Sequence, residues 1–192
     1  MPLALGPSAL NFNLMKLPAL VLCALLVGSF NLKADDSISS LVAGKLVSLQ
    51  NGVRAPVDDS TLTPIKYYAI YYSAQWCPPC HHFTPELVKF YNDFKPSHPD
   101  FELIFVSEDH NDDAMLAYMK EMSMPWPAVR FNSLMHDGSG TFKGSGIEGF
   151  AGGGIPDLVL VDSTGKVLSD SFQGDQYVGP DKVIDDIKSM VK

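Results

Sequence analysis

Cysteine and positive charge are both scarce in this chain. It has three cysteines in 192 residues, too few for the disulfide framework that stabilises small cysteine-rich domains. Lys and Arg number 14 against 22 Asp and Glu, which gives a net charge of -8, and the basic residues are scattered singly. Because nucleic-acid surfaces need clustered positive charge, we expect no nucleic-acid partner.

Long hydrophobic runs are also missing, since no run reaches the roughly 20 apolar residues of a membrane-spanning helix. The most apolar segment is MKLPALVLCALLVGSF, residues 15–30, which carries one lysine near its start and is followed by polar NLKADDS. This pattern is typical of a secretory signal peptide. We therefore predict a signal peptide over residues 1–34, with Met15 as a possible true start. The protein is then exported, to the periplasm or outside the cell, and anchoring by an uncleaved signal is the less favoured alternative.

The remaining residues, 35–192, have the length of one domain with a core, and 46% of the whole chain is hydrophobic. Two short strands are expected on either side of the Asn51-Gly52 turn, which is a strong hairpin signal. KYYAIYYSA (66–74) and FELIFVS (101–107) are nearly continuous apolar runs of strand length. The segment IPDLVLVDSTGKVLSDSF predicts an antiparallel hairpin.

Three segments have helical periodicity. After Cys80, apolar residues recur at spacings of four, three and four, which predicts an amphipathic helix with a bend at Pro85. Residues 112–122 and the C-terminal stretch GPDKVIDDIKSMVK predict two more helices. A helix between two buried strands indicates a parallel β-α-β unit, and hence an α/β fold. Residues 124–154, rich in glycine from Gly138 onward, are expected to be loop.

Cys77-Pro78-Pro79-Cys80 stands between a buried strand and a helix. The positive end of a helix stabilises a thiolate, which makes the first cysteine a nucleophile. The second cysteine lies one turn further into the helix and can resolve a mixed disulfide. The spacing therefore predicts a redox-active pair, Cys77 and Cys80.

Cys77-Pro78-Pro79-Cys80-His81 also fits the C-x-x-C-H string that attaches c-type haem. Haem attachment explains the two cysteines and His81 but not Trp76, Pro85 or the flanking strands, so it is the distant alternative. The histidine and cysteine spacing matches no structural zinc site, and GSGIEG (144–149) follows no strand, which argues against a dinucleotide site. We expect no metal and no bound cofactor.

Several motifs together resemble one family. They are WCPPC, FTPELVKFY after it, FVSED on the next strand, MPW, and GIP before the last hairpin. In combination they resemble the thioredoxin superfamily, and within it the tryparedoxin and nucleoredoxin branch. The resemblance implies a thioredoxin-like fold, with a central mixed β-sheet flanked by helices and an N-terminal β-hairpin extension.

The resemblance also implies roles for residues. Cys77 attacks, Cys80 resolves, and Trp76 packs beside the pair. Pro156 matches a cis-proline opposite the disulfide, and Ile155 offers backbone groups to a substrate chain. Tyr71 stands where thioredoxins proper carry a buried acid, and a phenol is a poor proton acceptor near neutral pH.

Two departures from the family pattern affect charge near the thiols. Asp157 follows Pro156 where the family commonly has Thr or Ser, so we expect a carboxylate beside the substrate groove that disfavours acidic partners and raises the pKa of the thiol. His81 replaces a frequent basic residue and would add positive charge near the thiolate only below about pH 6.5. A simple solvated position is the alternative for both His81 and His82.

The predicted function is therefore an exported thiol:disulfide oxidoreductase, which reduces protein disulfides through Cys77 and Cys80. Its partners are protein thiols and disulfides together with a membrane or soluble electron donor, and we expect a monomer. Alternatives are a cytochrome c maturation thiol reductase, a disulfide oxidase or isomerase of the same fold, and a binding module that uses the groove at Pro156 without catalysis.

Overall fold

The computed structural model describes residues 37–134 and 146–192, which belong to one compact unit. The predicted signal segment, residues 1–34, lies outside the described residues. The helices are α1 (Ile38–Val42), α2 (Pro78–Phe94), α3 (Asp112–Glu121) and α4 (Pro180–Met190). The strands are β1 (Leu46–Gln50), β2 (Val53–Pro56), β3 (Tyr67–Ser73), β4 (Phe101–Ser107), β5 (Ala128–Val129), β6 (Asp157–Asp162), β7 (Val167–Asp170), β8 (Phe172–Gln173) and β9 (Gln176–Tyr177).

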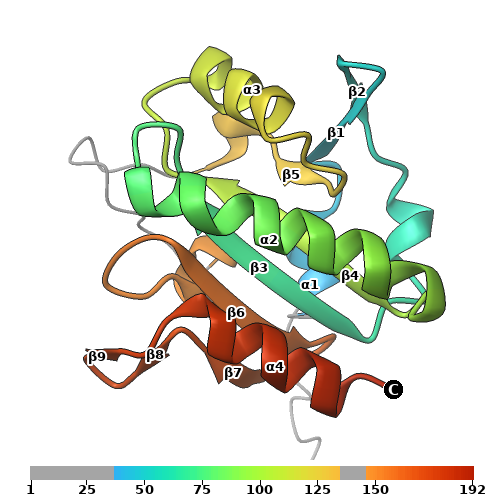
Figure 1. Ribbon diagram of the computed structural model, residues 1–192. Helices are drawn as coiled ribbons and strands as arrows, with labels where there is room; N and C mark the ends of the chain where they lie inside the picture. The colour runs from blue at the N-terminus through green and yellow to red at the C-terminus, as the bar shows by residue number, and fades with distance from the viewer. Residues whose placement is uncertain (1–36, 135–145) are drawn as a thin grey trace, which may run out of the picture. The chain divides into compact units, whose positions relative to one another are not determined.

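Seven strands form one mixed sheet in the order β2-β1-β5-β4-β3-β6-β7 (Figure 1). β3 pairs in parallel with β4 and antiparallel with β6, so it is a central strand. The parallel β3-α2-β4 unit and the antiparallel β6-β7 hairpin are both as predicted. This is the thioredoxin-like fold that the motifs implied. The small β8-β9 hairpin follows as a separate pair.

The N-terminal hairpin of β1 and β2 confirms the Asn51-Gly52 prediction. Both turn residues have positive φ, 52° for Asn51 and 77° for Gly52. Asn and Gly are the residues that tolerate this conformation, which a two-residue turn between twisted strands requires. The hairpin extends the sheet at the edge beyond β5.

The two faces of the sheet have separate hydrophobic cores. Side chains alternate along β3, so that Tyr71 lies in the core shared with α2, α3 and α4, while Tyr72 lies in the core that contains α1. Figure 1 shows α2 and α4 crossing the same face of the sheet, next to each other. The central strands contribute side chains to both cores and are therefore buried on both faces. This explains why their sequences are continuously apolar.

The first turn of α2 is set by its own sequence. Cys77 is the N-cap in an extended conformation, and Pro78 and Pro79 occupy the first helical positions, where a missing N–H costs nothing. The helix continues through Pro85 to Phe94 without a break. The predicted bend at this proline therefore does not interrupt the helix.

The described parts of the predicted loop, 124–134 and 146–154, include a short strand. β5 lies in this region and pairs with both β1 and β4, and Trp126 is fully buried in the core. β5 has only two residues, and a strand of this length shows no periodicity in the sequence. In the part of the chain that the structure describes, none of the helices has the length and apolar character to cross a membrane.

Candidate active site

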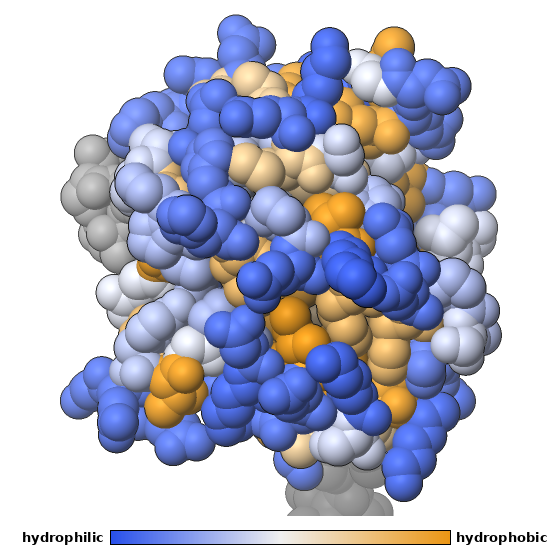
Figure 2. All heavy atoms as spheres, viewed as in Figure 1, coloured by the Kyte–Doolittle hydropathy of each residue, from blue (hydrophilic) through white to orange (hydrophobic). Residues whose placement is uncertain are grey.

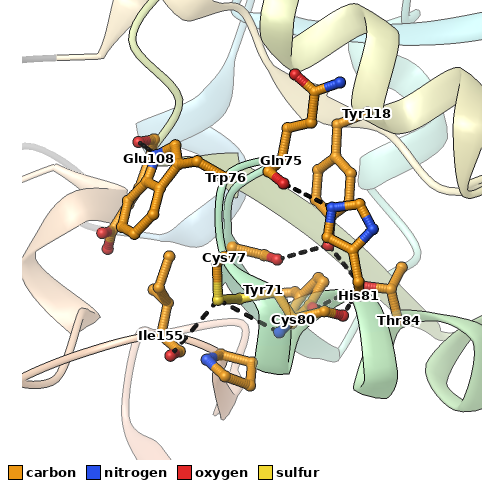
Figure 3. Close-up of a disulfide and its surroundings, with 12 residues drawn as sticks. Tyr71, Gln75, Trp76, Cys77, Cys80, His81, Thr84, Glu108, Tyr118 and Ile155 are labelled. Carbon is orange, nitrogen blue, oxygen red and sulfur yellow. Dashed lines mark hydrogen bonds between the residues drawn. A yellow bond between two sulfur atoms is a disulfide. The ribbon is translucent and has the colours of Figure 1, made fainter.

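Cys77 and Cys80 are joined in a disulfide at the start of α2, with an S–S distance of 2.14 Å and 5.3 Å between their Cα atoms (Figure 3). The backbone N–H of Cys80 also points at Cys77 Sγ, at 3.3 Å. Cys77 is 3% exposed and Cys80 is 0% exposed. Of the two residues, the one at the helix N-terminus therefore keeps the greater contact with solvent.

The loop before β6 forms the opposite wall of the site. The Ile155–Pro156 peptide bond is cis, which confirms the prediction for Pro156. The carbonyl oxygen of Ile155 lies 3.8 Å from Cys77 Sγ. Tyr177 in the β8-β9 hairpin donates a hydrogen bond to the carbonyl of Pro156, at 2.9 Å. A substrate that reaches Cys77 must therefore pass this loop.

The turn between β3 and α2 is held by residues at the end of β4. The N–H of Gln75 donates to the carboxylate of Asp109 at 2.8 Å, and Nε2 of His81 bonds the carbonyl of Gln75 at 2.6 Å. Trp76 donates its indole N–H to the carbonyl of Glu108 at 3.1 Å. These contacts fix the backbone that precedes Cys77.

The side chain of Trp76 is 53% exposed and stacks on His110, with the ring planes 10° apart. An indole held in this way presents a flat apolar surface beside Cys77 (Figure 3). The implied packing of Trp76 beside the cysteine pair stays a prediction.

A network of buried hydroxyl groups lies behind the disulfide, on the side of α2 and α3. Thr84 donates to the carbonyl of Cys80 at 2.7 Å, which uses its single hydroxyl proton. Tyr71 at 2.8 Å and Tyr118 at 2.7 Å must then both donate to Thr84 Oγ1, and Ser73 donates to Tyr118 at 3.0 Å. Burial raises the pKa of Tyr71 far above its usual range. The network is thus complete and uncharged near neutral pH.

Two carboxylates lie on the other side of the site. Asp157 is fully buried, its Oδ2 accepts the N–H of Gly152 at 2.7 Å, and its Oδ1 has no hydrogen-bond partner among the described residues. Burial raises the pKa of Asp157 to about 7, against the opposing effect of the Gly152 N–H. Burial, and then the negative charge of Asp157, raise the pKa of Glu108 to about 7 as well.

The predicted effect of Asp157 on acidic partners and on the pKa of the thiol stays a prediction. Asp157 follows Pro156, but its side chain is 0% exposed and accepts the backbone N–H of Gly152. The reason is the two-residue alternation along β6, which turns Asp157 toward the same face as Val159 and away from the α2 face.

His81 is half-buried, and its predicted effect on the thiolate stays a prediction. Its Nε2 is engaged by Gln75 and its ring lies 5.1 Å from that of Tyr118. Since the ring is held by these contacts and the two sulfurs are bonded to each other, the arrangement favours dithiol chemistry over the C-x-x-C-H haem alternative.

Sequence reasoning missed the residues that support the site, namely Gln75, Thr84, Glu108, Asp109 and Tyr118. Glu108 and Asp109 belong to the FVSED motif and Thr84 belongs to the FTPELVKFY motif, so the sequence marked these positions but not their contacts. Tyr118 lies in neither motif, and its partners come from other segments of the chain.

The chain matches a protein-family model described as "Thioredoxin-like" over residues 65–167. It is 36% identical over 139 residues to probable nucleoredoxin 1 of Arabidopsis thaliana, covering 71% of this chain and 22% of that protein. It is also 36% identical over 111 residues to the nucleoredoxin of Danio rerio, covering 58% of this chain and 25% of the relative. The chain thus spans about a quarter of the length of these relatives.

Solved structures show the same similarity. Tryparedoxin I from Leishmania major is 30% identical with a TM-score of 0.51, covering 68% of this chain and 81% of that one. Thioredoxin from Wuchereria bancrofti is 29% identical with a TM-score of 0.53, covering 77% of this chain and 96% of that one. The implied branch of the superfamily is confirmed.

The predicted location is wrong. The relatives are nucleoredoxins, which are intracellular proteins, and this contradicts the expected export to the periplasm or outside the cell. The prediction rested on the composition of residues 15–30, and a short apolar run with one lysine can occur without directing export.

Proposed function

The chain belongs to the thioredoxin-like family of thiol-disulfide oxidoreductases, and from this premise we propose that it reduces the disulfides of other proteins through Cys77 and Cys80. The observation that carries the proposal is the position of Cys77. It is the N-cap of α2, it is bonded to Cys80, and it faces the carbonyl that precedes a cis-proline. Family membership supports thiol-disulfide exchange as the reaction. The class of substrate and the direction in which electrons flow are what we propose.

The first step uses the reduced protein. The thiolate of Cys77, stabilised by the N–H of Cys80 and the positive end of α2, attacks one sulfur of the substrate disulfide. A mixed disulfide forms between Cys77 and the substrate, and the other substrate sulfur leaves as a thiolate. Trp76 and the Ile155-Pro156 loop flank the place where the substrate chain lies.

The second step releases the substrate. Cys80 loses its proton and attacks Cys77 Sγ, which restores the Cys77–Cys80 disulfide and frees the second substrate thiol. Two electrons pass from the dithiol to the substrate, so a donor of thiol or hydride electrons must reduce the pair again. The hydroxyl groups of Tyr71, Thr84 and Tyr118 are already hydrogen-bonded to one another and are uncharged near neutral pH, so they are poor acceptors for the Cys80 proton. We therefore propose that this proton passes to solvent or to the leaving thiolate.

The direction of the reaction can be measured as a reduction potential. We expect a value near the thioredoxin value of about -270 mV, obtained by equilibration with glutathione or dithiothreitol. A potential above roughly -150 mV would instead assign the protein as an oxidase.

Activity is tested by reduction of insulin disulfides with dithiothreitol as the donor. We expect Cys77→Ala to abolish the catalysed rate and Cys80→Ser to abolish turnover. Cys23→Ser is the matched control, because it removes the third cysteine and should leave the rate unchanged. Loss of activity in Cys23→Ser, or full activity in Cys77→Ala, would contradict the assignment.

The partner is identified by the same variants. Cys80→Ser cannot complete the second step, so it should accumulate mixed disulfides that dithiothreitol releases. A trapped apocytochrome would support the narrower prediction of a cytochrome c maturation reductase. Partners that bind Cys77→Ala equally well would support the non-catalytic binding module.

A further inference from the structure

A groove runs from the disulfide end of the molecule along the line where α2 and α4 lie side by side. Its first part, of about 310 Å³, is lined by residues of the active-site region that include Pro79, Pro156 and Tyr177. Its second part, of about 430 Å³, continues between the two helices over Phe90, Phe94 and Ile184. Glu86 and Asp181 line both parts, so the two hollows adjoin at these residues.

The floor of the groove is apolar. Phe90 and Phe94 stack with their ring centroids 5.0 Å apart, and Ile184 lies opposite them on α4. Figure 2 shows hydrophobic surface between hydrophilic side chains in this part of the molecule. An apolar strip with a polar rim is the usual composition of a surface that binds protein.

The charge of the rim is negative. Lys89 is paired with Asp93 at 2.6 Å, and Lys188 with Asp185 at 3.1 Å, so both lysines are neutralised by neighbours. Glu86 and Asp181 are exposed and form no ion pair with any residue that the structure describes. A positively charged side chain at this point would meet two carboxylates that the described lysines and arginines leave without an ion pair.

The distance from the disulfide sets which part of a substrate reaches these carboxylates. At a rise of about 1.5 Å per residue, Glu86 lies roughly 13 Å along α2 from Cys77. An extended peptide covers about 3.3 Å per residue, so about four residues separate a reacting cysteine from a side chain at Glu86.

We propose that this groove, Pro79 to Phe94 on α2 and Tyr177 to Lys188 opposite, docks the segment that flanks the reactive cysteine of a substrate protein. The segment carries Lys or Arg about four residues from the cysteine, at Glu86 and Asp181, and apolar side chains beyond it. The inference rests on the proposed function. It adds the charge of the substrate side chain that the groove selects and the position of that side chain relative to the reactive cysteine.

The test uses three peptides that differ only four residues from a single cysteine, where they carry Arg, Gln or Glu. Each cysteine is linked to an aryl thiol in a mixed disulfide. The reduced protein attacks the peptide sulfur, the coloured aryl thiolate leaves because its pKa is low, and Cys80 then releases the peptide thiol. Rate constants are measured in single turnover at low and at high salt.

We expect the Arg peptide to react about 10-fold faster than the Glu peptide, since exposed ion pairs contribute a factor of about 2 to 5 each. High salt should bring this ratio toward 1. The double variant Glu86→Gln with Asp181→Asn should also bring the ratio of the Arg and Glu peptide rates toward 1. It should leave the rate with the Gln peptide unchanged. The matched control is Glu121→Gln with Asp113→Asn, which removes the same charges from α3, one of them again from the first turn of a helix. It should keep the 10-fold ratio.

A ratio that the groove variant leaves unchanged would overturn the proposal, as would a preference for the Glu peptide. A groove covered by another segment of the chain or by a second copy would give equal rates with all three peptides, which also overturns it. If the protein reduced none of them, the proposed function itself would fail. Reduction of all three without discrimination would retain that function and remove only the docking surface.

Discussion

The two sides of the disulfide are built from different chemistry. On the α2 and α3 side, Tyr71, Thr84 and Tyr118 form a closed set of hydroxyl hydrogen bonds. On the opposite side, the described residues give buried Asp157 a hydrogen bond to only one of its two oxygens, and its negative charge raises the pKa of Glu108. The first side can remain neutral over a wide pH range, whereas the second must gain or lose protons near pH 7.

This difference assigns stability and pH response to different residues. A closed hydroxyl network contributes by satisfying buried polar groups, and its loss should be felt equally at every pH. A buried carboxylate contributes through its protonation state, so its effect depends on pH. Substitutions on the two sides should therefore be separable by measuring unfolding at several pH values.

The largest effect is expected for Thr84→Val, which keeps the shape of the side chain and removes the oxygen shared by Tyr71 and Tyr118. Two buried hydroxyls lose an acceptor, and we expect the free energy of unfolding to fall by about 2–3 kcal/mol. Urea unfolding should show the same loss at pH 5 and pH 8. A loss of unfolding free energy at only one of the two pH values would contradict the conclusion that the hydroxyl network is uncharged.

Asp157→Asn should have the next largest effect, and it should be stabilising. The pKa of Asp157 is raised to about 7 in the folded protein, against about 3.9 in the unfolded chain. The folded state therefore holds the proton more tightly, and the wild type loses stability as pH rises from about 4 to about 7. Asn keeps an oxygen for Gly152 without a charge, so the variant should be more stable than the wild type by about 2 kcal/mol at pH 8.

At pH 4, where Asp157 is largely protonated in the folded protein, the advantage of this variant should nearly vanish. Urea unfolding across this pH range measures both values. A variant that follows the wild-type slope would show that another group produces the pH dependence.

Tyr71→Phe sharpens the comparison from the hydroxyl side. It removes one donor and leaves Thr84 with Tyr118 and the Cys80 carbonyl, so no buried group loses its last partner. We expect a loss of about 1 kcal/mol in the free energy of unfolding. The pH dependence of disulfide reduction should not change, since the raised pKa keeps this phenol protonated in the wild type. A shifted pH profile would give Tyr71 a role in proton transfer.

Glu108→Gln should give the smallest effect. Its pKa is raised to about 7, first by burial and then by Asp157, so it too destabilises the folded state as pH rises toward 7. Because its side chain is less buried than that of Asp157, we expect a gain below about 1 kcal/mol at pH 8. In the Asp157→Asn background the gain should shrink, which a double-variant cycle measures.

The sequence predicted the fold well where the signal was local. The Asn51-Gly52 hairpin, the apolar strands β3 and β4, and the redox turn at Cys77 each depend on neighbouring residues. β5 was missed because two residues carry no period, and the hydroxyl network was missed because it joins β3, α2 and α3. The burial of Asp157 was not predicted because the direction of its side chain depends on the alternation of β6. The location was wrong because composition alone does not determine where a protein goes.

The central claim is that Cys77 is the attacking thiol, and alkylation of the reduced protein tests it most directly. Iodoacetamide is added at several pH values, and mass spectrometry locates the modified cysteine. We predict that Cys77 is modified first, with a pKa below the ordinary thiol value of about 8.5, and that Cys80 stays protected until the protein unfolds. Modification of Cys80 first, or of Cys77 with an ordinary thiol pKa, would contradict the account.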